Sequence, residues 1–113
     1  MRRVVKVGGS LLLRSDLRQA LPGWLDNQSK AETLVVVGGG ELIDAIRHLD
    51  STHPGDPTET HWLCVDLLDA TFRLFASWFD WKCVHTSEAL RSRIKDGFGT
   101  ETPSLISVSA FYD

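Results

Sequence analysis

The stretch Leu34–Glu41 constrains the fold of this chain more than any other. It begins with a leucine and three valines, and a short run of β-branched apolar residues is typical of a strand buried on both faces. Three glycines follow at Gly38–Gly40, and from Glu41 onward apolar residues recur at helical spacing. The sequence therefore predicts a strand that ends in a glycine turn and continues as a helix, whose first turn has unpaired N–H groups that attract anions.

A second glycine turn follows the first predicted strand. The segment Val4–Val7 is apolar except for Lys6, and Gly8, Gly9 and Ser10 come directly after it. Because Lys6 lies within a run of valines, we expect it to be buried and to point toward the glycine turns. Two glycine turns and one inward-facing lysine predict a site for a polyphosphate. The alternative is that both are simply tight turns between strands and helices, since short glycine motifs often match by chance.

Length, charge and cysteine usage exclude several classes of protein. A chain of 113 residues predicts one domain spanning residues 1–113. The net charge of −3 gives no basic surface, so nucleic acid is not an expected partner. No run approaches the roughly 20 apolar residues of a membrane span and no leader peptide is evident, so we expect a cytoplasmic protein without a membrane partner. Cys64 and Cys83 have no metal-ligand spacing, which predicts buried free thiols and no metal site.

Strands and helices alternate along the predicted chain. This order predicts an α/β fold, with a mostly parallel sheet of about four strands and helices on both of its faces. We expect strands at about 3–7, 34–37, 82–85 and 105–108.

The helix boundaries are predicted from capping residues and from proline and glycine. The first helix begins after Ser15 or Asp16, and Pro22 is expected to kink or break it. The second is expected to end by His53. The fourth is capped by Ser87 and ends at Gly97.

The third helix is the longest and most apolar. Asp56 is its predicted N-cap, Pro57 follows at the first helical position, and the helix runs to about Phe79. Large apolar residues recur along it at three- and four-residue steps, so much of it is expected to be buried: Trp62, Val65, Leu68, Phe72, Phe75 and Phe79.

Two common phosphate-binding motifs do not fit the glycine turns. A Walker P-loop is excluded, because neither turn ends in Gly-Lys-Ser/Thr. The dinucleotide-binding fingerprint fits poorly, because Ile43 stands where its third glycine belongs and is too large for close helix packing.

A family does fit. The segments Val5–Leu11 and Val36–Gly40, in this order and each after a buried strand, resemble the amino acid kinase (aspartate/glutamate/uridylate kinase) superfamily. The resemblance implies that Lys6, Gly8, Gly9 and Ser10 hold the transferring phosphates of ATP, with Mg as the accompanying ion. It also implies that Gly38, Gly39 and Gly40 bind a small-molecule phosphoryl acceptor.

A narrower resemblance concerns Gly39–Asp44 and His61–Cys64, which are similar to the aminomethylfuran-methyl phosphate kinase branch of this superfamily. There the acceptor is a phosphate that carries a primary amine. The resemblance implies that His61 contacts the acceptor phosphate and that Asp66 or Asp69 contacts its ammonium. The alternative is that all three are solvated residues on the helix surface.

The resemblance covers only the acceptor half of such kinases. Their second half carries the adenine pocket, an aspartate that organises the glycine loops and a second phosphate-binding lysine, and residues 105–113 contain none of these motifs. We therefore expect a kinase-like protein that is truncated before the nucleotide-binding half and incomplete on its own. Its expected partner is a complementing C-terminal half or a second copy in a homo-oligomer. The alternative is a non-catalytic remnant or interaction module that retains the acceptor-side fold.

Overall fold

The computed structural model describes residues 1–112. In chain order its elements are β1 (Arg2–Val7), the 3₁₀ helix η1 (Gly9–Leu13), α1 (Leu17–Asp26), β2 (Glu32–Val37), α2 (Glu41–Thr52), α3 (Pro57–Ala76), β3 (Lys82–Val84), α4 (Ser87–Asp96), β4 (Ser104–Ile106) and the 3₁₀ helix η2 (Val108–Phe111). The alternation of strands and helices predicted from the sequence is confirmed.

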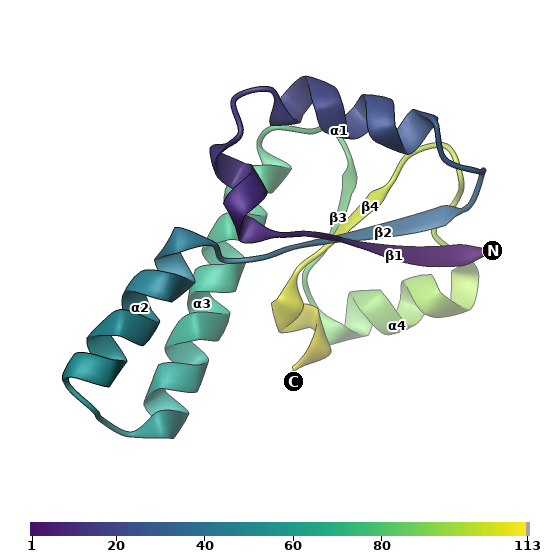
Figure 1. Ribbon diagram of the computed structural model, residues 1–113. Helices are drawn as coiled ribbons and strands as arrows, with labels where there is room; N and C mark the ends of the chain where they lie inside the picture. The colour runs from purple at the N-terminus through teal and green to yellow at the C-terminus, as the bar shows by residue number, and fades with distance from the viewer. Residues whose placement is uncertain (113) are drawn as a thin grey trace.

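The strands form one sheet in the order β1-β2-β4-β3, and every neighbouring pair is parallel (Figure 1). The β1–β2 pairing is the longest and runs in register from Arg2 opposite Glu32 to Val7 opposite Val37. Strand β4 lies between β2 and β3, although it is last in the chain. The predicted α/β fold with a parallel sheet is therefore confirmed, and β1 and β3 are its edge strands.

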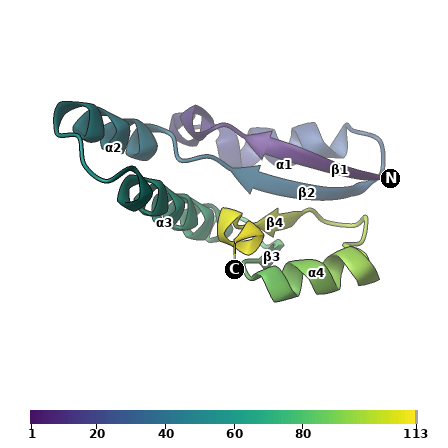
Figure 2. The ribbon, with the colours of Figure 1, turned by 90° about the horizontal axis from the view of Figure 1, so that it is seen from below.

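Helices cover both faces of the sheet, as predicted (Figure 2). On one face, α1 and the end of α3 enclose a core of eight buried residues: Val7, Leu17, Leu21, Val35, Val37, Phe72, Phe75 and Leu105. On the other face, α4 and η2 close a smaller core of Val84, Leu90, Phe98, Ile106 and Ala110. Side chains alternate along each strand, so adjacent residues of β4 such as Leu105 and Ile106 enter different cores.

Helices α2 and α3 pack against each other as an arm that extends beyond the sheet (Figure 1). The expectation that α3 is buried along much of its length is wrong for this reason. Its buried residues are Val65, Thr71, Phe72 and Phe75, whereas Trp62 and Leu63 in the arm are exposed. The helix ends at Ala76, before Phe79, and the Phe79 ring instead stacks on Trp81 beyond the helix end.

Helix α1 continues through Pro22, so the predicted break does not occur, and the alternative of a kink stays a prediction. Proline has no N–H, so the carbonyl of Arg18 loses its helical hydrogen bond. Leu17 and Leu21 are nevertheless buried against the sheet on the inner face of α1. Burial of this face stabilises the helical conformation across the proline, because most of a helix's stability in a protein comes from its packed face.

The capping residues predicted for α3 and α4 agree with the structure, with one correction. The Asp56 carboxylate accepts a 2.9 Å hydrogen bond from the Thr58 N–H, as predicted for an N-cap. In α4 the cap is Thr86, not Ser87, because the Thr86 hydroxyl accepts a 3.1 Å bond from the Ala89 N–H. Gly97 ends α4 with a φ of 98°, a conformation that favours glycine.

The cysteines are free, but the expectation that both are buried is wrong. Cys64 is partly buried in the arm, and Cys83 is exposed because β3 lies at the edge of the sheet. Partial burial still raises the pKa of the Cys83 thiol. Among residues 1–112, no helix combines the length and apolar character that a bilayer crossing requires.

Candidate functional site

The two glycine turns lie side by side at one end of the sheet. They follow β1 and β2, which are adjacent and parallel, so both strands end at the same edge. The Gly38 N–H donates a 2.9 Å hydrogen bond to the Val7 carbonyl and joins the two turns. The motifs at residues 8–10 and 38–40 are therefore neighbours in space, as a shared site requires.

Gly9 and Gly40 are needed for the contact between these turns. A Cβ built on Gly9 would stand 1.9 Å from the Gly40 nitrogen, and one on Gly40 would stand 2.7 Å from the Gly9 carbonyl oxygen. Gly40 also has a φ of 57° and a ψ of −135°, which residues with a side chain rarely adopt. The fold itself accounts for these two glycines.

Gly39 and Gly8 differ in what surrounds them. A Cβ on Gly39 would lie 2.0 Å from Cγ1 of Ile43, so a side chain at position 39 would have to displace that of Ile43. Gly8 has an ordinary φ of −60°, and a Cβ built on it would meet nothing within 4 Å. Neither backbone conformation nor packing within residues 1–112 therefore requires a glycine at position 8.

A pocket of about 500 Å³ opens beside both turns. It lies at the carboxyl ends of the strands, where ligands of open α/β sheets generally bind. Its lining comes from β1, β2, both glycine turns, α2, α3 and η2: Lys6, Gly8, Gly9, Val36, Val37, Gly38, Gly39, Gly40, Ile43, Asp44, Arg47, Cys64, Leu68 and Val108. We refer to this cavity below as the glycine-turn pocket.

The start of α2 faces this pocket. Gly40 is its N-cap and has no side chain to accept hydrogen bonds from the first turn. The N–H groups of residues 41–43 come before the first intrahelical hydrogen bond, which runs from the Asp44 N–H to the Gly40 carbonyl. Gly39, Gly40 and Ile43 line the pocket, so the positive end of the helix dipole lies at its wall.

Lys6 lines the glycine-turn pocket, but the expectation that it is buried is wrong. It lies on the face of β1 that no helix covers, and Val4 on the same face is 69% exposed. The valine-rich pattern indicated a buried strand, whereas β1 is at the edge of the sheet. Within the described residues Lys6 forms no ion pair, so its ammonium is available to a ligand.

Sequence reasoning missed two charged residues of this pocket. Asp44 and Arg47 lie on α2, one helical turn apart, and both line the cavity. One signal in the sequence could have indicated Arg47. It lies four residues after Ile43, so the two side chains share one face of α2, and Ile43 lines the pocket. Helical spacing does not by itself say which face of α2 meets a cavity.

The other predicted site residues do not line the glycine-turn pocket. Ser10 is exposed in η1, and Asp66 is exposed on α3. The His61 ring contacts Trp62 and Tyr112, with ring centroids 4.9 Å and 5.9 Å away. The predicted contacts of His61 and Asp66 with an acceptor therefore remain predictions.

Asp69 takes part in a different contact. Its carboxylate accepts a 3.2 Å hydrogen bond from the buried Ser107 hydroxyl, which lies 2.8 Å from the Ser109 hydroxyl. Asp69 also lines a separate pocket of about 310 Å³ with Phe72, Arg73 and His85. In this structure Asp69 joins α3 to the segment that follows β4.

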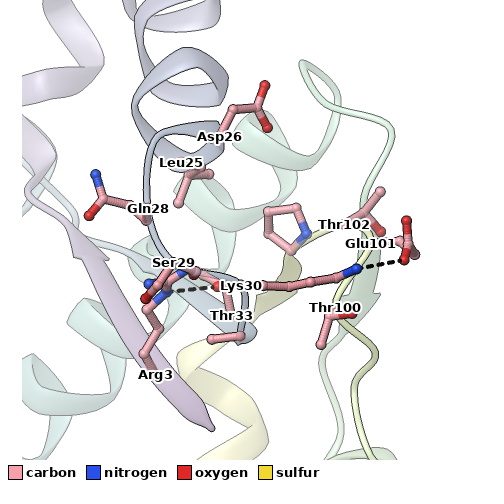
Figure 3. Close-up of a pocket in the computed structure, with 12 residues that line it drawn as sticks. Arg3, Leu25, Asp26, Gln28, Ser29, Lys30, Thr33, Thr100, Glu101 and Thr102 are labelled. Atoms are coloured by element: carbon pink, nitrogen blue, oxygen red, sulfur yellow. Dashed lines mark hydrogen bonds and ion pairs between the residues drawn. The ribbon is translucent and has the colours of Figure 1, made fainter.

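A further pocket of about 200 Å³ lies at the opposite end of the strands (Figure 3). Its cationic side chains already have partners. Arg3 donates to the Thr33 hydroxyl at 3.0 Å and to the Ser29 carbonyl, and the Lys30 ammonium lies 3.6 Å from the Glu101 carboxylate. These contacts favour the glycine-turn pocket as the candidate anion site, because Lys6 and Arg47 in its lining form no ion pair among residues 1–112.

The donors of the glycine-turn pocket fit phosphate groups better than they fit a bare metal ion. Residues 1–112 contain no group of three or more His, Cys, Asp or Glu side chains placed to hold a metal. Asp44 brings the one carboxylate found in the described lining of this pocket. A magnesium ion at this site would take most of its ligands from phosphate oxygens and water, which is its usual coordination in phosphoryl-transfer sites.

No protein-family model matches this chain, and a search of curated proteins gives no match either. The functional assignment therefore depends on the residues and the geometry described above.

Proposed function

We propose that this chain is the acceptor-side part of a small-molecule kinase of the amino acid kinase type, incomplete on its own. The reaction would transfer the γ-phosphoryl group of ATP to a small acceptor. The observation that carries the proposal is that an unpaired lysine, two glycine turns and a helix N-terminus all border one pocket. Phosphoryl transfer needs mainly positioning and neutralisation of negative charge, and these groups supply both.

Each group has a defined role in this proposal. ATP, accompanied by magnesium, supplies the transferred phosphoryl group. Lys6 neutralises the charge that develops on the phosphoryl oxygens, and backbone N–H groups of Gly39, Gly40 and the first turn of α2 donate to them. A complementing C-terminal half supplies the adenine pocket and the second cation.

Gly8 gives this proposal independent support. Its backbone conformation suits any residue, and its missing side chain leaves open space beside the pocket. A glycine at such a position is explained if a ligand must approach the backbone closely.

A second candidate function is a non-catalytic interaction module, and two surfaces favour it. Strand β1 is an open edge beside an apolar groove of about 420 Å³, whose lining includes Val5, Leu21 and Trp24. The arm of α2 and α3 exposes further apolar side chains, including Leu49 and Trp62. Open strand edges and exposed apolar surface are typical of sites that pair with another polypeptide.

The first experiment measures pyrophosphate binding by calorimetry to the unmodified chain, Lys6→Met and the control Lys95→Met. Lys95 is an exposed lysine of α4 and does not line the pocket. We expect Lys6→Met to weaken binding by about 1.5–3 kcal/mol, the contribution of a hydrogen bond to a charged group. The Lys95→Met variant is expected to bind like the unmodified chain. Equal affinity of all three proteins would contradict the proposed phosphate site.

Cys64 provides a second readout, because it lines the pocket whereas Cys83 does not. Saturating pyrophosphate is expected to slow alkylation of Cys64 and to leave the alkylation rate of Cys83 unchanged.

A complementation experiment separates the kinase from the interaction module, with the second half of an amino acid kinase supplied in trans. Consumption of ATP that depends on Lys6 supports the kinase, whereas a stable complex that binds ATP without transfer supports the interaction module.

A further inference from the structure

Strand β1 has backbone groups that face away from the rest of the sheet. It is an edge strand, and among residues 1–112 it pairs with β2 alone (Figure 2). The Gly38 N–H donates to the Val7 carbonyl, so the backbone groups of Val7 point toward β2. In a parallel pair the N–H and C=O groups of one residue point to the same side, and successive residues alternate. The N–H and C=O groups of Arg2, Val4 and Lys6 therefore point to the open edge.

An apolar groove of about 420 Å³ runs beside this open edge, and we call it the β1 groove. It is bordered by β1, by α1 and by the segment between them: Val5, Lys6, Val7, Leu11, Arg14, Leu17, Ala20, Leu21 and Trp24. A strand that paired with β1 would place every second side chain on the face of the sheet where this groove lies. An extended polypeptide would thus satisfy the open backbone groups and fill the groove at the same time, as in β-strand addition.

The charges around the open edge favour an acidic segment. The charged side chains in the lining of the β1 groove are Lys6 and Arg14, and within residues 1–112 no carboxylate lines it. Arg14 pairs with Asp16, and Arg2 on the other face of β1 pairs with Glu32. No ion pair of the described residues involves Lys6. Lys6 is therefore the cation that a bound segment can neutralise.

A second copy of β1 would fit this edge poorly. Antiparallel pairing of two β1 strands about Val4 would place Arg2 of each copy opposite Lys6 of the other. Like charges directly opposite each other destabilise a strand pair, and lysine on an edge strand is a common means of preventing self-pairing. The same charges attract a strand whose side chains on this face are acidic.

We propose that the open edge of β1 binds an extended segment of another polypeptide in which acidic and apolar residues alternate. The backbone of this segment pairs with Arg2, Val4 and Lys6. Its apolar side chains enter the β1 groove, and an acidic side chain pairs with the Lys6 ammonium. This inference rests on the interaction module, the second candidate function above, and it names the partner of that module.

The probe is the acetylated and amidated peptide Thr-Glu-Val-Thr-Val-Glu-Thr, which reads the same in both directions. With its central threonine beside Val4, one glutamate lies beside Lys6 and both valines lie on the groove face, whichever way the peptide runs. One control peptide has lysine in place of both glutamates. A second control peptide keeps the glutamates but is N-methylated at its three central residues, which removes backbone donors.

Hydrogen exchange of single amides, measured by NMR, tests the backbone pairing. The glutamate peptide is expected to slow exchange of the N–H groups of Arg2, Val4 and Lys6. The N–H groups of Arg3 and Val5 are already bonded to β2, so their exchange should change little. The N-methylated peptide should protect none of these amides.

Calorimetry tests the choice of an acidic partner. The lysine peptide is expected to bind about tenfold more weakly than the glutamate peptide, because a repulsion replaces an attraction at Lys6. Lys6→Glu should reverse the order of the two affinities, whereas the control Lys95→Glu, on α4, should keep it. Far-UV circular dichroism checks that both variants are folded, and the peptide exchange tests the charge without any change to the chain.

Three results would overturn this inference. The first is no protection of the Arg2, Val4 and Lys6 amides by the glutamate peptide, or equal binding of its N-methylated form, and this result would also contradict the interaction module at this edge. The second is equal affinity for the glutamate and lysine peptides. In that case strand addition and the module stand, and only the acidic partner is wrong. The third is protection of these amides that rises with protein concentration in the absence of peptide, because a second copy would then occupy the edge.

Discussion

The backbones of Gly9 and Gly40 are in direct contact, since a Cβ built on Gly9 would stand 1.9 Å from the Gly40 nitrogen. These residues come from turns that follow different strands and are held together by the pairing of β1 with β2. Both glycines line the glycine-turn pocket. The glycines of one motif thus serve two purposes, because Gly9 is required by the fold and Gly8 is not.

Alanine substitutions are expected to separate these two purposes. Gly9→Ala should destabilise the protein by about 1–3 kcal/mol or more, because its methyl group overlaps the Gly40 backbone. Gly8→Ala should leave stability unchanged or raise it by about 0.4–1 kcal/mol, since its conformation suits alanine. Urea unfolding measures both, and pyrophosphate binding should weaken in Gly8→Ala. Equal stability of the two variants would contradict the contact between the turns.

The stability of the chain is expected to depend on pH through Glu32. Its carboxylate accepts a 2.7 Å hydrogen bond from the Phe98 N–H and a 2.9 Å bond from Arg2, and these contacts lower the pKa of Glu32 below 4.5. The ionised form is favoured in the folded state, so the stabilisation is present above pH 4.5 and is lost as the pH falls through the lowered pKa.

Urea unfolding midpoints of the unmodified chain and Glu32→Gln, measured between pH 7 and pH 3, provide the test. The loss of stability toward acid pH should be smaller in Glu32→Gln. Some pH dependence should remain, because Arg14 also lowers the pKa of Asp16. Glu101→Gln is the control, since Glu101 is exposed and forms only a long surface contact with Lys30. Identical pH profiles of Glu32→Gln and the unmodified chain would show that ionisation of Glu32 does not stabilise the fold.

The aromatic end of α3 is expected to contribute much of the stability of the larger core. Phe75 is fully buried, and its ring lies 4.9 Å from Phe79 and 5.9 Å from Trp78. Phe75→Ala should cost about 3–5 kcal/mol in the free energy of unfolding, because it leaves a cavity among these rings. Leu74→Ala, at a position that is 51% exposed, should change stability by about 0.5 kcal/mol or less. Similar losses of unfolding free energy in both variants would contradict the burial of Phe75 in the larger core.

The cap of α4 provides a small, local prediction. Thr86→Ala should cost about 1 kcal/mol, because the Ala89 N–H loses its hydrogen-bond acceptor. Ser87→Ala should change stability by less than about 0.5 kcal/mol, since Ser87 follows the cap and is already helical. A larger loss in Ser87→Ala than in Thr86→Ala would restore the cap predicted from the sequence.

The local structure of this chain was predictable because its causes are local. The valine-rich run before Gly38 predicts a strand, and the Asp56–Pro57 pair predicts the start of α3. Gly97 predicts the end of α4 in the same way. Each of these signals depends on residues a few positions apart, and together they predict the alternation of an α/β fold.

The wrong predictions concern which other strands and helices an element packs against in the fold. The pattern around Lys6 is that of a buried strand, but β1 is at the edge of the sheet and Lys6 is exposed. Pro22 predicts a kink or a break, but α1 has no break there, because Leu17 and Leu21 are buried on its inner face.

The candidate site shows the same division between local and tertiary causes. The sequence by itself determined that two glycine turns follow two strands and that Lys6 precedes one of them. Only the tertiary structure decided that Gly9 touches Gly40, that Arg47 lines their pocket, and that His61 does not. The spacing of apolar residues along the sequence indicates that one face of a helix or strand is buried and another is polar. Strand order and helix direction determine which residues meet across the fold.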